Sequence, residues 1–250
     1  MSSTFRQRLK NREVLIGTLV TLGIPEISEV LSGAGFDWLF FDAEHAPLDT
    51  LALQHLALGA GATPCLVRLA ASNELEVKKA LDIGAAGIIA PQVNSAEQAA
   101  QMVRWAKYSP LGTRGVGTAR AHGYGFTFKE YLETSNDNTV VVVQAEHGDA
   151  VNNIEAIVQV TGVDAVLVGP NDLSASLGHL GDMAHPEVVA AIDRVTEVCR
   201  RAGMPLGIFG MTPAAVKPYF ERGYTLIVCG IDTVLLGTAA RELLTDVMQS

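Results

Sequence analysis

Polar residues that can do chemistry follow several apolar runs of this chain. The run Trp38–Asp42 ends in an acid and leads directly to Glu44 and His45. Two further acids, Glu146 and Asp172, each come shortly after an apolar run rich in valine. In α/β enzymes built on parallel strands, catalytic groups lie just past the carboxyl ends of buried strands. These acids and this histidine are therefore the first candidates for an active site.

Glu146 and Asp172 follow two predicted strands that are consecutive along the chain. Neighbouring strands of a sheet lie about 4.8 Å apart, so the two carboxylates can converge on one cation. Oxygen ligands favour Mg²⁺ or Mn²⁺, and two protein carboxylates leave coordination positions for water and for a chelating substrate. The competing interpretations are a helix N-cap for Asp172 and a surface acid for Glu146.

Arg68 and His45 are the basic candidates. Arg68 ends an otherwise apolar run, where a guanidinium is costly unless it meets an anion. Its planar fork suits a carboxylate or an enolate oxygen, and an internal salt bridge is the alternative. His45 is the best candidate for a general base because imidazole titrates near neutral pH, although a structural histidine is the alternative. No lysine closes a predicted strand, which disfavours a Schiff-base mechanism.

Eight apolar segments alternate with stretches of helical periodicity, a pattern that predicts βαβ units and a parallel sheet. In a chain of 250 residues this count favours a closed (β/α)8 TIM barrel over an open doubly wound sheet. We expect residues 1–250 to form a single domain. The predicted strands are Leu15–Val20, Trp38–Asp42, Cys65–Arg68, Gly87–Ala90, Thr139–Ala145, Ala165–Val168, Leu206–Phe209 and Leu226–Cys229.

Helix starts and one long loop are also predicted. The segment Ser95–Gln98 fits a capping box, and Thr212-Pro213 places a capping hydroxyl before a proline suited to a first helical turn. Apolar residues at spacings of three and four predict a helix over Pro186–Arg200. The glycine-rich stretch 107–127 follows the fourth βα unit and is predicted as a loop near the active-site face.

Composition excludes several classes of protein. Hydrophobic residues make up 48% of the chain and charged residues 18%, which is ample for a core. A formal charge of -9 disfavours nucleic acid or an anionic membrane as a partner. The three cysteines lie far apart in apolar surroundings and are interpreted as buried thiols of a reducing compartment. With no signal-peptide core and no apolar segment long enough to span a membrane, we expect a cytoplasmic protein.

A series of short motifs runs through the chain almost from end to end. The motifs are Gly35-Phe36-Asp37-Trp38, Asp42-Ala43-Glu44-His45-Ala46-Pro47, Val67-Arg68, Leu81-Asp82-Ile83-Gly84-Ala85, Arg114-Gly115-Val116-Gly117, Gln144-Ala145-Glu146, Gly169-Pro170-Asn171-Asp172-Leu173-Ser174 and Gly230-Ile231-Asp232. Taken together in their order and spacing, they resemble the HpcH/HpaI aldolase family. The resemblance implies a (β/α)8 barrel and a class II, metal-dependent aldolase of the 4-hydroxy-2-oxoheptanedioate or 2-dehydro-3-deoxyglucarate type. Such a lyase reversibly cleaves 4-hydroxy-2-oxo acids to pyruvate and an aldehyde through a pyruvate enolate.

The resemblance also implies roles for the oxygen ligands and their neighbours. Glu146 and Asp172 would bind the divalent cation, with Mg²⁺ or Mn²⁺ preferred and Co²⁺ or Zn²⁺ as further possibilities. Gln144 and Asn171, together with Asp172, would lie near the bound oxo acid, and Arg68 would face the pyruvate enolate. Position 171 is often a small residue in the family, so Asn171 is expected to contact the substrate through its backbone.

The same resemblance makes His45 the catalytic base. Asp82, which strand ends alone would not select, is then expected to hold His45 in position and raise its basicity. Asp42 and Glu44 fall in the same motif and are expected to have supporting roles.

Two other functions remain open at this stage. One is a CoA-ester lyase of the citrate lyase β type, although the chain has no evident basic CoA-binding stretch. The other is a non-catalytic barrel that binds an oxo acid, which the intact set of candidate residues disfavours. For assembly, the family resemblance implies a homohexamer with C-terminal helices exchanged between neighbours. The leucine-rich segment 234–244 is compatible with that exchange and with ordinary barrel packing.

Overall fold

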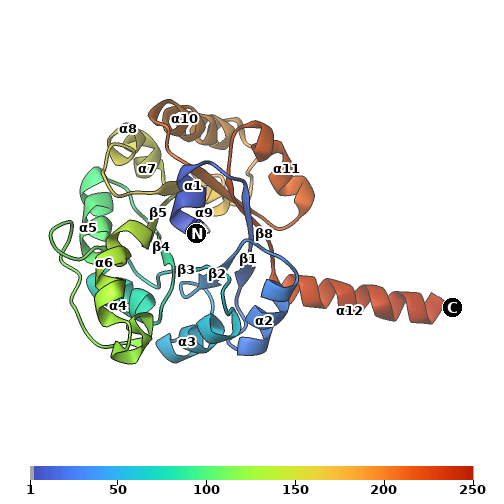
Figure 1. The fold of residues 1–250 in the computed structure, drawn as a ribbon. Coiled ribbons are helices and arrows are strands. Elements are labelled where there is room, and N and C mark those ends of the chain that lie inside the picture. Colours follow the sequence, from blue (N-terminus) through green and yellow to red (C-terminus); the bar gives the residue numbers. More distant parts are fainter. Residues whose placement is uncertain (1–2, 250) are drawn as a thin grey trace.

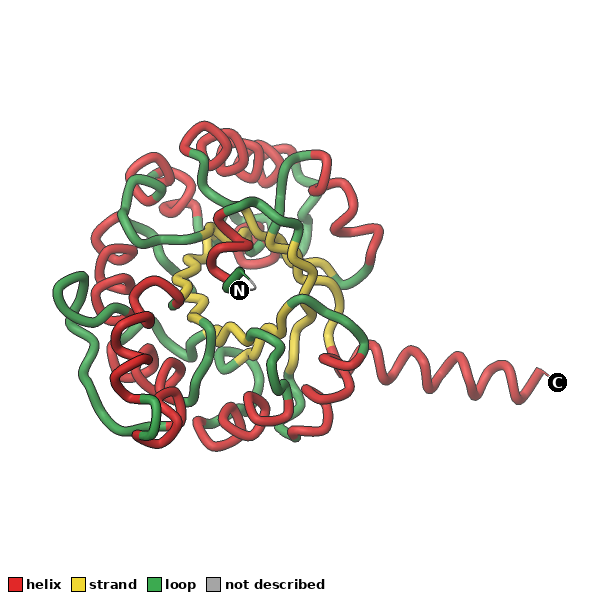
Figure 2. The backbone as a smooth tube through the Cα atoms, in the orientation of Figure 1, coloured by secondary structure: helices red, strands yellow, loops and turns green. Residues whose placement is uncertain are grey.

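Eight parallel strands close into a barrel in the computed structural model, which describes residues 3–249 (Figure 1). Each strand pairs with the next along the chain, and β8 pairs with β1 to complete the ring (Figure 2). The predicted single-domain (β/α)8 fold is confirmed. The strands are β1 Leu15–Val20, β2 Trp38–Asp42, β3 Cys65–Arg68, β4 Gly87–Ala90, β5 Val140–Ala145, β6 Ala165–Val168, β7 Leu206–Gly210 and β8 Leu226–Ile231.

Helices surround the strands, and their predicted starts are confirmed. The hydroxyl of Ser95 accepts from the backbone of Gln98, and that of Thr212 accepts from the backbone of Ala215. These contacts satisfy amide groups that have no partner within the first helical turn. The helices are α1 Phe5–Lys10, α2 Pro25–Gly33, α3 Thr50–Gly59, α4 Glu74–Asp82, α5 Ala96–Ala106, the 3₁₀ helix η1 Arg120–Gly125, α6 Phe128–Asn138, α7 Gly148–Asn152, α8 Ile154–Ile157, α9 Pro170–Ser176, α10 Pro186–Ala202, α11 Pro213–Glu221 and α12 Asp232–Gln249.

The end of the barrel at which the strands begin, here called the amino end, is filled with side chains. Helix α1 lies across this end (Figure 1), and Phe5 and Leu9 belong to the same buried cluster as the inward side chains of the strands. The ring of Phe5 lies 6.1 Å from that of Trp38. Gly17 leaves room for this indole, since a Cβ there would lie 2.6 Å from Trp38 Cε2. A cavity that reaches the strand ends must therefore open at the opposite, carboxyl end.

The glycine-rich stretch 107–127 lies at the amino end, so its predicted position near the active-site face is wrong. It follows α5, which returns the chain to the end at which strands begin, and it leads through α6 to the start of β5. Lys107 Nζ donates to the carbonyl of Thr139, directly before β5, at 2.6 Å. Arg120 donates to the carbonyl of Ile83, at the end of α4, at 2.6 Å. The active-site loops of a barrel follow strands, whereas this loop follows a helix.

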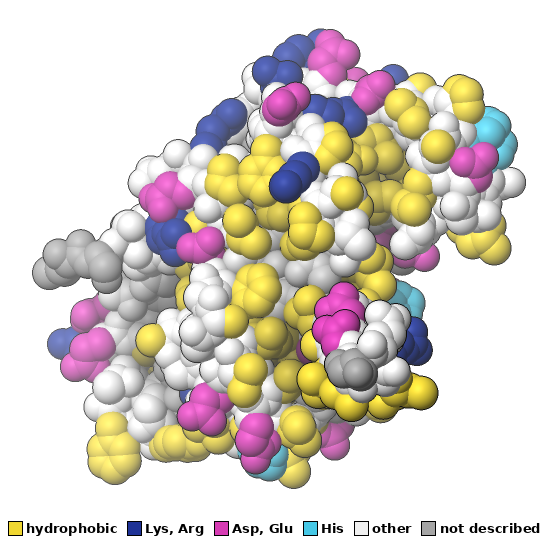
Figure 3. Space-filling model, turned by 90° about the vertical axis from the view of Figure 1, so that its right-hand side faces the viewer, with side chains coloured by type: hydrophobic (Ala, Val, Ile, Leu, Met, Phe, Trp, Pro, Cys, Tyr) yellow, Lys and Arg dark blue, Asp and Glu magenta, His cyan; other side chains and the backbone are white. Residues whose placement is uncertain are grey.

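Helix α12 projects away from the barrel instead of packing along its wall (Figure 1). Every other βα unit places a helix against the strands, so α12 is the exception. Figure 3 looks along α12 toward the barrel and shows apolar side chains along one side of it. Among residues 3–249, no helix is long and apolar enough to cross a membrane. The exposed apolar residues of α12 are Val234, Leu235, Leu236, Leu243, Leu244, Val247 and Met248.

Candidate active site

A cavity of about 690 Å³ opens at the carboxyl end of the barrel. The charged and amide side chains that line it come from the ends of β2, β3, β5 and β6, whereas β1, β7 and β8 and the residues after them contribute apolar side chains and two threonines. This is the end at which barrel enzymes carry their active sites. Candidate residues that line it are Asp42, His45, Arg68, Gln144, Asn171 and Asp172, and the apolar side includes Leu19, Leu22, Phe209 and Ile231.

Arg68 and Asp42 form a buried, two-pronged ion pair at the ends of β3 and β2. Arg68 Nε and Nη2 donate to the two oxygens of Asp42 at 2.9 and 2.7 Å, and Nε also lies 3.3 Å from Glu44 Oε2. Asp42 Oδ1 accepts from the backbone amides of Glu44 and His45 as well. The internal salt bridge considered for Arg68 is therefore present. Arg68 Nη1 has no protein acceptor within residues 3–249, so the guanidinium keeps donors for a bound anion.

His45 stands at the rim of the cavity on the turn that follows β2. Its side chain is 63% exposed, and Nε2 lies 3.7 Å from Glu44 Oε2. The hydrogen bond from its backbone amide to Asp42 fixes the turn that presents the imidazole. This placement leaves His45 accessible to a substrate in the cavity, which a general base requires.

Asp82 does not lie near His45 of the same chain, so the predicted contact between these two residues is not formed within one chain. Asp82 ends α4, which leads to the start of β4 at the amino end of the barrel. Its Oδ1 accepts from Arg114 Nη2 at 2.7 Å. The buried Arg114 guanidinium also donates to Tyr131 at 3.1 Å and lies over the ring of Tyr108. The motif around Asp82 carries no signal for a partner in the distant loop of Arg114.

Glu146 carries a buried carboxylate directly after β5. Its Oε1 accepts from the backbone amide of Gln92 at 2.8 Å, and its Oε2 accepts from the side-chain amide of Gln144. The pKa of Glu146 is raised to about 7, chiefly by burial and additionally by the carboxylates of Glu44 and Asp172. A buried acid with two further acids nearby is an unfavourable arrangement until a cation joins it.

The residues after β5 and β6 fit a divalent cation. Asp172 lies in the first turn of α9, directly after β6, and its charge acts on Glu146. Gly169 leaves space for Glu146, because a Cβ at that position would lie 2.9 Å from Glu146 Cβ. Gln144 Oε1 is buried and has no hydrogen-bond partner among the described residues. Two carboxylates and an unpartnered amide oxygen form the all-oxygen set that Mg²⁺ and Mn²⁺ prefer.

Comparison with known proteins identifies the family. The model of the HpcH/HpaI aldolase/citrate lyase family matches residues 16–239. The chain belongs to this family. An aldolase from Pseudomonas putida that acts on 2-dehydro-3,6-dideoxy-6-sulfogluconate is 40% identical over 94% of this chain and 93% of its own length. A 5-keto-4-deoxy-D-glucarate aldolase from Klebsiella pneumoniae is also 40% identical, over 96% of this chain and 94% of its own.

Solved structures agree with this assignment. An HpcH/HpaI aldolase/citrate lyase family protein from Burkholderia cenocepacia superimposes with a TM-score of 0.93 at 39% identity, over 97% of this chain and 98% of the other. The chain is therefore an aldolase, a carbon-carbon lyase, and the resemblance read from its motifs is confirmed.

Two residues beside the candidate site have roles that the sequence did not predict. Gln92 follows β4 with a φ of +54°, a strained conformation for a non-glycine residue, and its amide holds Glu146. No side-chain signal could reveal a contact made by the backbone. Asp232, after β8, accepts from the amides of Thr21 and Leu22 at 2.8 Å and so ties the ends of β8 and β1 together. The position of Asp232 shortly after a predicted strand is a sequence signal that marks it as a candidate site residue.

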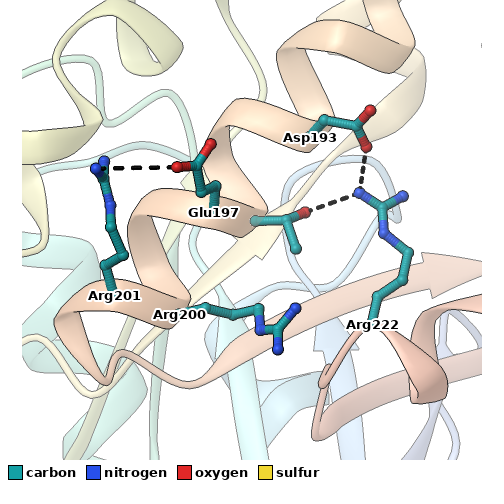
Figure 4. Close-up of a pocket in the computed structure, with 6 residues that line it drawn as sticks. Asp193, Glu197, Arg200, Arg201 and Arg222 are labelled. Atoms are coloured by element: carbon teal, nitrogen blue, oxygen red, sulfur yellow. Dashed lines mark hydrogen bonds and ion pairs between the residues drawn. The ribbon is translucent and has the colours of Figure 1, made fainter.

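A second cavity of the aldolase, of about 500 Å³, lies on the outer surface between α10 and the end of α11 (Figure 4). Arg222 pairs with Asp193 and donates to Thr196 at 3.1 Å. Arg201 lies 3.9 Å from Glu197. These two pairs are exposed or half-buried, Arg200 has no carboxylate partner among the described residues, and no strand end contributes to the cavity. Exposed pairs of this kind contribute little and do not indicate catalysis.

Proposed function

We propose that this aldolase reversibly cleaves 4-hydroxy-2-oxo acids to pyruvate and an aldehyde, with a divalent cation held by Glu146 and Asp172. The observation that carries the proposal is the unpartnered oxygen of Gln144, which lines the same cavity as Arg68 and Asp172 and lies directly beside the buried carboxylate of Glu146. The names of the similar chains, which are aldolases of deoxy sugar acids, support the substrate class.

The oxo acid would bind between the cation ligands and Arg68. When bound, a divalent cation would supply Lewis acidity toward a 2-oxo acid and so favour the enolate. Glu146 and Asp172 would hold this cation, with Mg²⁺ or Mn²⁺ preferred, and Gln144 would add its amide oxygen. Asn171, exposed at the start of α9, would contact the oxo acid. Arg68 Nη1 would donate to the enolate oxygen, a contact that is strongest when the charge is fully developed.

His45 would act as the base. It would take the proton of the C4 hydroxyl, and the electron pair of the C3–C4 bond would move into the C2–C3 bond of the enolate as C4 becomes the aldehyde carbonyl. Protonation at C3 then releases pyruvate. Asp42 and Glu44 would support this step, because Asp42 fixes both Arg68 and the turn that carries His45. For Asp82 the structure offers no such role within one chain.

A coupled assay tests the proposal. Incubation with a 4-hydroxy-2-oxo acid and Mg²⁺ or Mn²⁺ should yield pyruvate, measured through a dehydrogenase, and chelation of the cation should stop its formation. Cleavage of a malyl-type CoA ester without any pyruvate would favour the citrate lyase β reading instead. Binding of pyruvate with no cation-dependent rate would indicate a non-catalytic barrel.

His45→Ala tests the base. We expect kcat for cleavage to fall by at least about 10²-fold, the usual contribution of a general base, while pyruvate binding is retained. His55→Ala, on α3 and outside the cavity, is the matched control and should leave both unchanged. Loss of pyruvate binding in His45→Ala would make His45 a ligand instead of a base.

We further propose that the protein is a homohexamer in which α12 packs on a neighbouring copy. The exposed apolar side of α12 supports this, because an unpacked apolar helix face is unfavourable in water. Light scattering of Leu243→Asp should report smaller particles, whereas Glu242→Gln on the same turn should not change the mass. The free thiols Cys65, Cys199 and Cys229 support a reducing, cytoplasmic location.

A further inference from the structure

A cluster of two histidines and one acid lies outside the cavity, on the segment that joins α9 to α10 and on the first turn of α10. His179 Nε2 lies 2.9 Å from Glu187 Oε2, and the rings of His179 and His185 stack with centroids 3.4 Å apart. One ligand atom from each residue lies within 4.8 Å of the other two. Both histidines are half-buried and Glu187 is exposed. Two imidazoles and a carboxylate at this spacing form a donor set known from zinc sites.

The backbone under this cluster is anchored. The amide of His179 donates to the carbonyl of Ser174 at 2.7 Å, and the amide of His185 donates to Asp182 at 3.2 Å. The hydroxyl of the fully buried Ser174 accepts from the amide of Gly181 at 3.1 Å. The segment between the two histidines is thus folded back in a defined loop. Pre-positioned ligands on a fixed backbone reduce the entropy that a cation must overcome on binding.

We propose that His179, His185 and Glu187 form a second metal site, which takes a nitrogen-preferring ion of the Zn²⁺, Co²⁺ or Ni²⁺ class. The oxygen-only set at Glu146 and Asp172 suits Mg²⁺ or Mn²⁺, whereas imidazole donors favour the later transition metals. Three protein ligands leave a fourth tetrahedral position for water.

Side-chain rotation is needed to close the cluster around an ion, because the two stacked rings hold their nitrogen lone pairs in nearly parallel planes. In a tetrahedral zinc site with bonds of about 2.0–2.1 Å, ligand atoms lie about 3.3 Å apart, within the 4.8 Å that bounds the separations here. The side chain of Glu187 is 59% exposed and that of His179 25%, so both have room to turn. In the absence of an ion, His185 Nδ1 accepts a 3.3 Å hydrogen bond from the Glu187 amide, a long contact that a rotation of the ring would release.

Occupancy of this site would stabilise the segment that carries Asp172. Ser174, which holds the loop of His179, also donates from its hydroxyl to the carbonyl of Asn171 at 2.7 Å. The second site is therefore connected by hydrogen bonds to the first turn of α9. A cation bound only by the folded chain raises the melting temperature to an extent set by its affinity and concentration.

Zinc titration of the full-length protein tests the proposal. With excess Mg²⁺ present to occupy the oxygen site, competition against a chelating dye should give one zinc equivalent per chain in the wild type. His179→Ala and His185→Ala should each weaken that equivalent by at least about tenfold and remove the zinc-dependent rise in melting temperature. His55→Ala should bind zinc as the wild type does.

A second background separates the two sites. Glu146→Gln combined with Asp172→Asn should lose the Mg²⁺-competable site and keep the zinc equivalent of His179 and His185. Two results would overturn the proposal. One is equal zinc binding by His179→Ala and the wild type, and the other is disappearance of all zinc binding in the Glu146→Gln, Asp172→Asn chain.

Discussion

The two ends of this barrel bury charged groups in opposite ways. At the amino end the buried charges have partners, as the pairs of Arg114 with Asp82 and of Arg6 with Asp164 show. Even the ammonium of Lys107, with no carboxylate in contact, donates to two backbone carbonyls. This end is closed by α1, and none of the described residues that line the cavity of about 410 Å³ beside that helix is an acid. Its charges therefore hold the structure together.

At the carboxyl end the acids outnumber their partners. Glu146 is 2% exposed, lies near the charges of Glu44 and Asp172, and has its pKa raised to about 7 mainly by burial. Gln144 turns its amide nitrogen to Glu146 and leaves its buried oxygen unpartnered. Arg68 is already engaged by Asp42. A buried charge without a partner is tolerated where a ligand of opposite charge binds to it. The unpaired acids at the carboxyl end therefore indicate a binding site, whereas the paired charges at the amino end indicate a role in stability.

The largest effect is expected from Glu146→Gln. Loss of one cation ligand should lower the aldolase rate by roughly 10³-fold, since metal stabilisation of the developing charge is worth several kcal/mol and each 1.36 kcal/mol is tenfold. In chelator, however, the melting temperature should stay equal or rise, because the amide removes a buried charge and lets the Gln144 amide turn to satisfy its oxygen.

Glu155→Gln, at an exposed acid paired with Arg194, is the control and should alter neither quantity. Calorimetry in chelator and the pyruvate assay with Mg²⁺ measure the two effects. A marked fall in melting temperature for Glu146→Gln without metal would mean that Glu146 is a structural acid, and the contrast between the two ends would fail.

Much of this contrast follows from the sequence. The strands were predicted to within two residues because buried parallel strands are continuous apolar runs, and the end of β8, at Ile231 instead of Cys229, is the largest deviation. His45, Arg68, Gln144 and Asp172 were placed at one cavity because strand ends of a closed barrel meet at one rim.

Contacts made through loops or backbone atoms could not be predicted. Asp82 meets Arg114, which lies 32 positions away in the long glycine-rich loop, where no periodicity constrains the partner. Gln92 acts through its amide, which is independent of residue type. The glycine content of the loop and its place after the fourth βα unit favour the active-site end, whereas its position directly after α5 fixes it at the amino end.

A smaller effect is expected at the amino end from Arg6→Met. Arg6 Nε donates to Asp164 Oδ1 at 2.8 Å, and the Asp164 side chain is 2% exposed. Removing the guanidinium leaves a buried carboxylate without its cation, so the free energy of unfolding should fall by about 3 kcal/mol. The aldolase rate of the folded protein should not change, because the site lies at the other end.

The Asp164→Asn background tests the cause of that loss. The side-chain oxygen of this variant can still accept the hydrogen bond that Asp164 Oδ2 receives from the Val141 amide, but the side chain carries no charge. In this background Arg6→Met should therefore lower the free energy of unfolding clearly less. Urea unfolding of the wild type, both single variants and the double variant measures this difference. Equal costs in both backgrounds would mean that Arg6 acts through packing, and a lower aldolase rate would show that the two ends are coupled.

The smallest effect is expected at Lys107, whose buried ammonium at the amino end has carbonyl partners but no carboxylate in contact among the described residues. Burial lowers the pKa of Lys107 to about 8, because two carbonyl dipoles compensate an ammonium less well than a carboxylate would. Above this pKa the folded chain has released the proton, while the unfolded chain keeps it up to the ordinary lysine pKa of about 10.4. The unfolded state then binds more protons, so Lys107 makes the unfolding free energy rise with pH across this interval.

Lys107→Met should flatten that rise, and Lys129→Met, at an exposed lysine, should not. Urea midpoints measured on both variants and the wild type from about pH 7 to about pH 10 isolate the contribution, since all other titrating groups are shared. If the unfolding free energy of Lys107→Met still rises with pH, another group causes the rise. Every buried charge at the amino end would then be fully compensated. If the rise disappears, the charge of Lys107 is only partly compensated, so the amino end also holds a buried charge without a full partner. The carboxyl end then differs because its unpaired acids lie at a cavity that a ligand can enter.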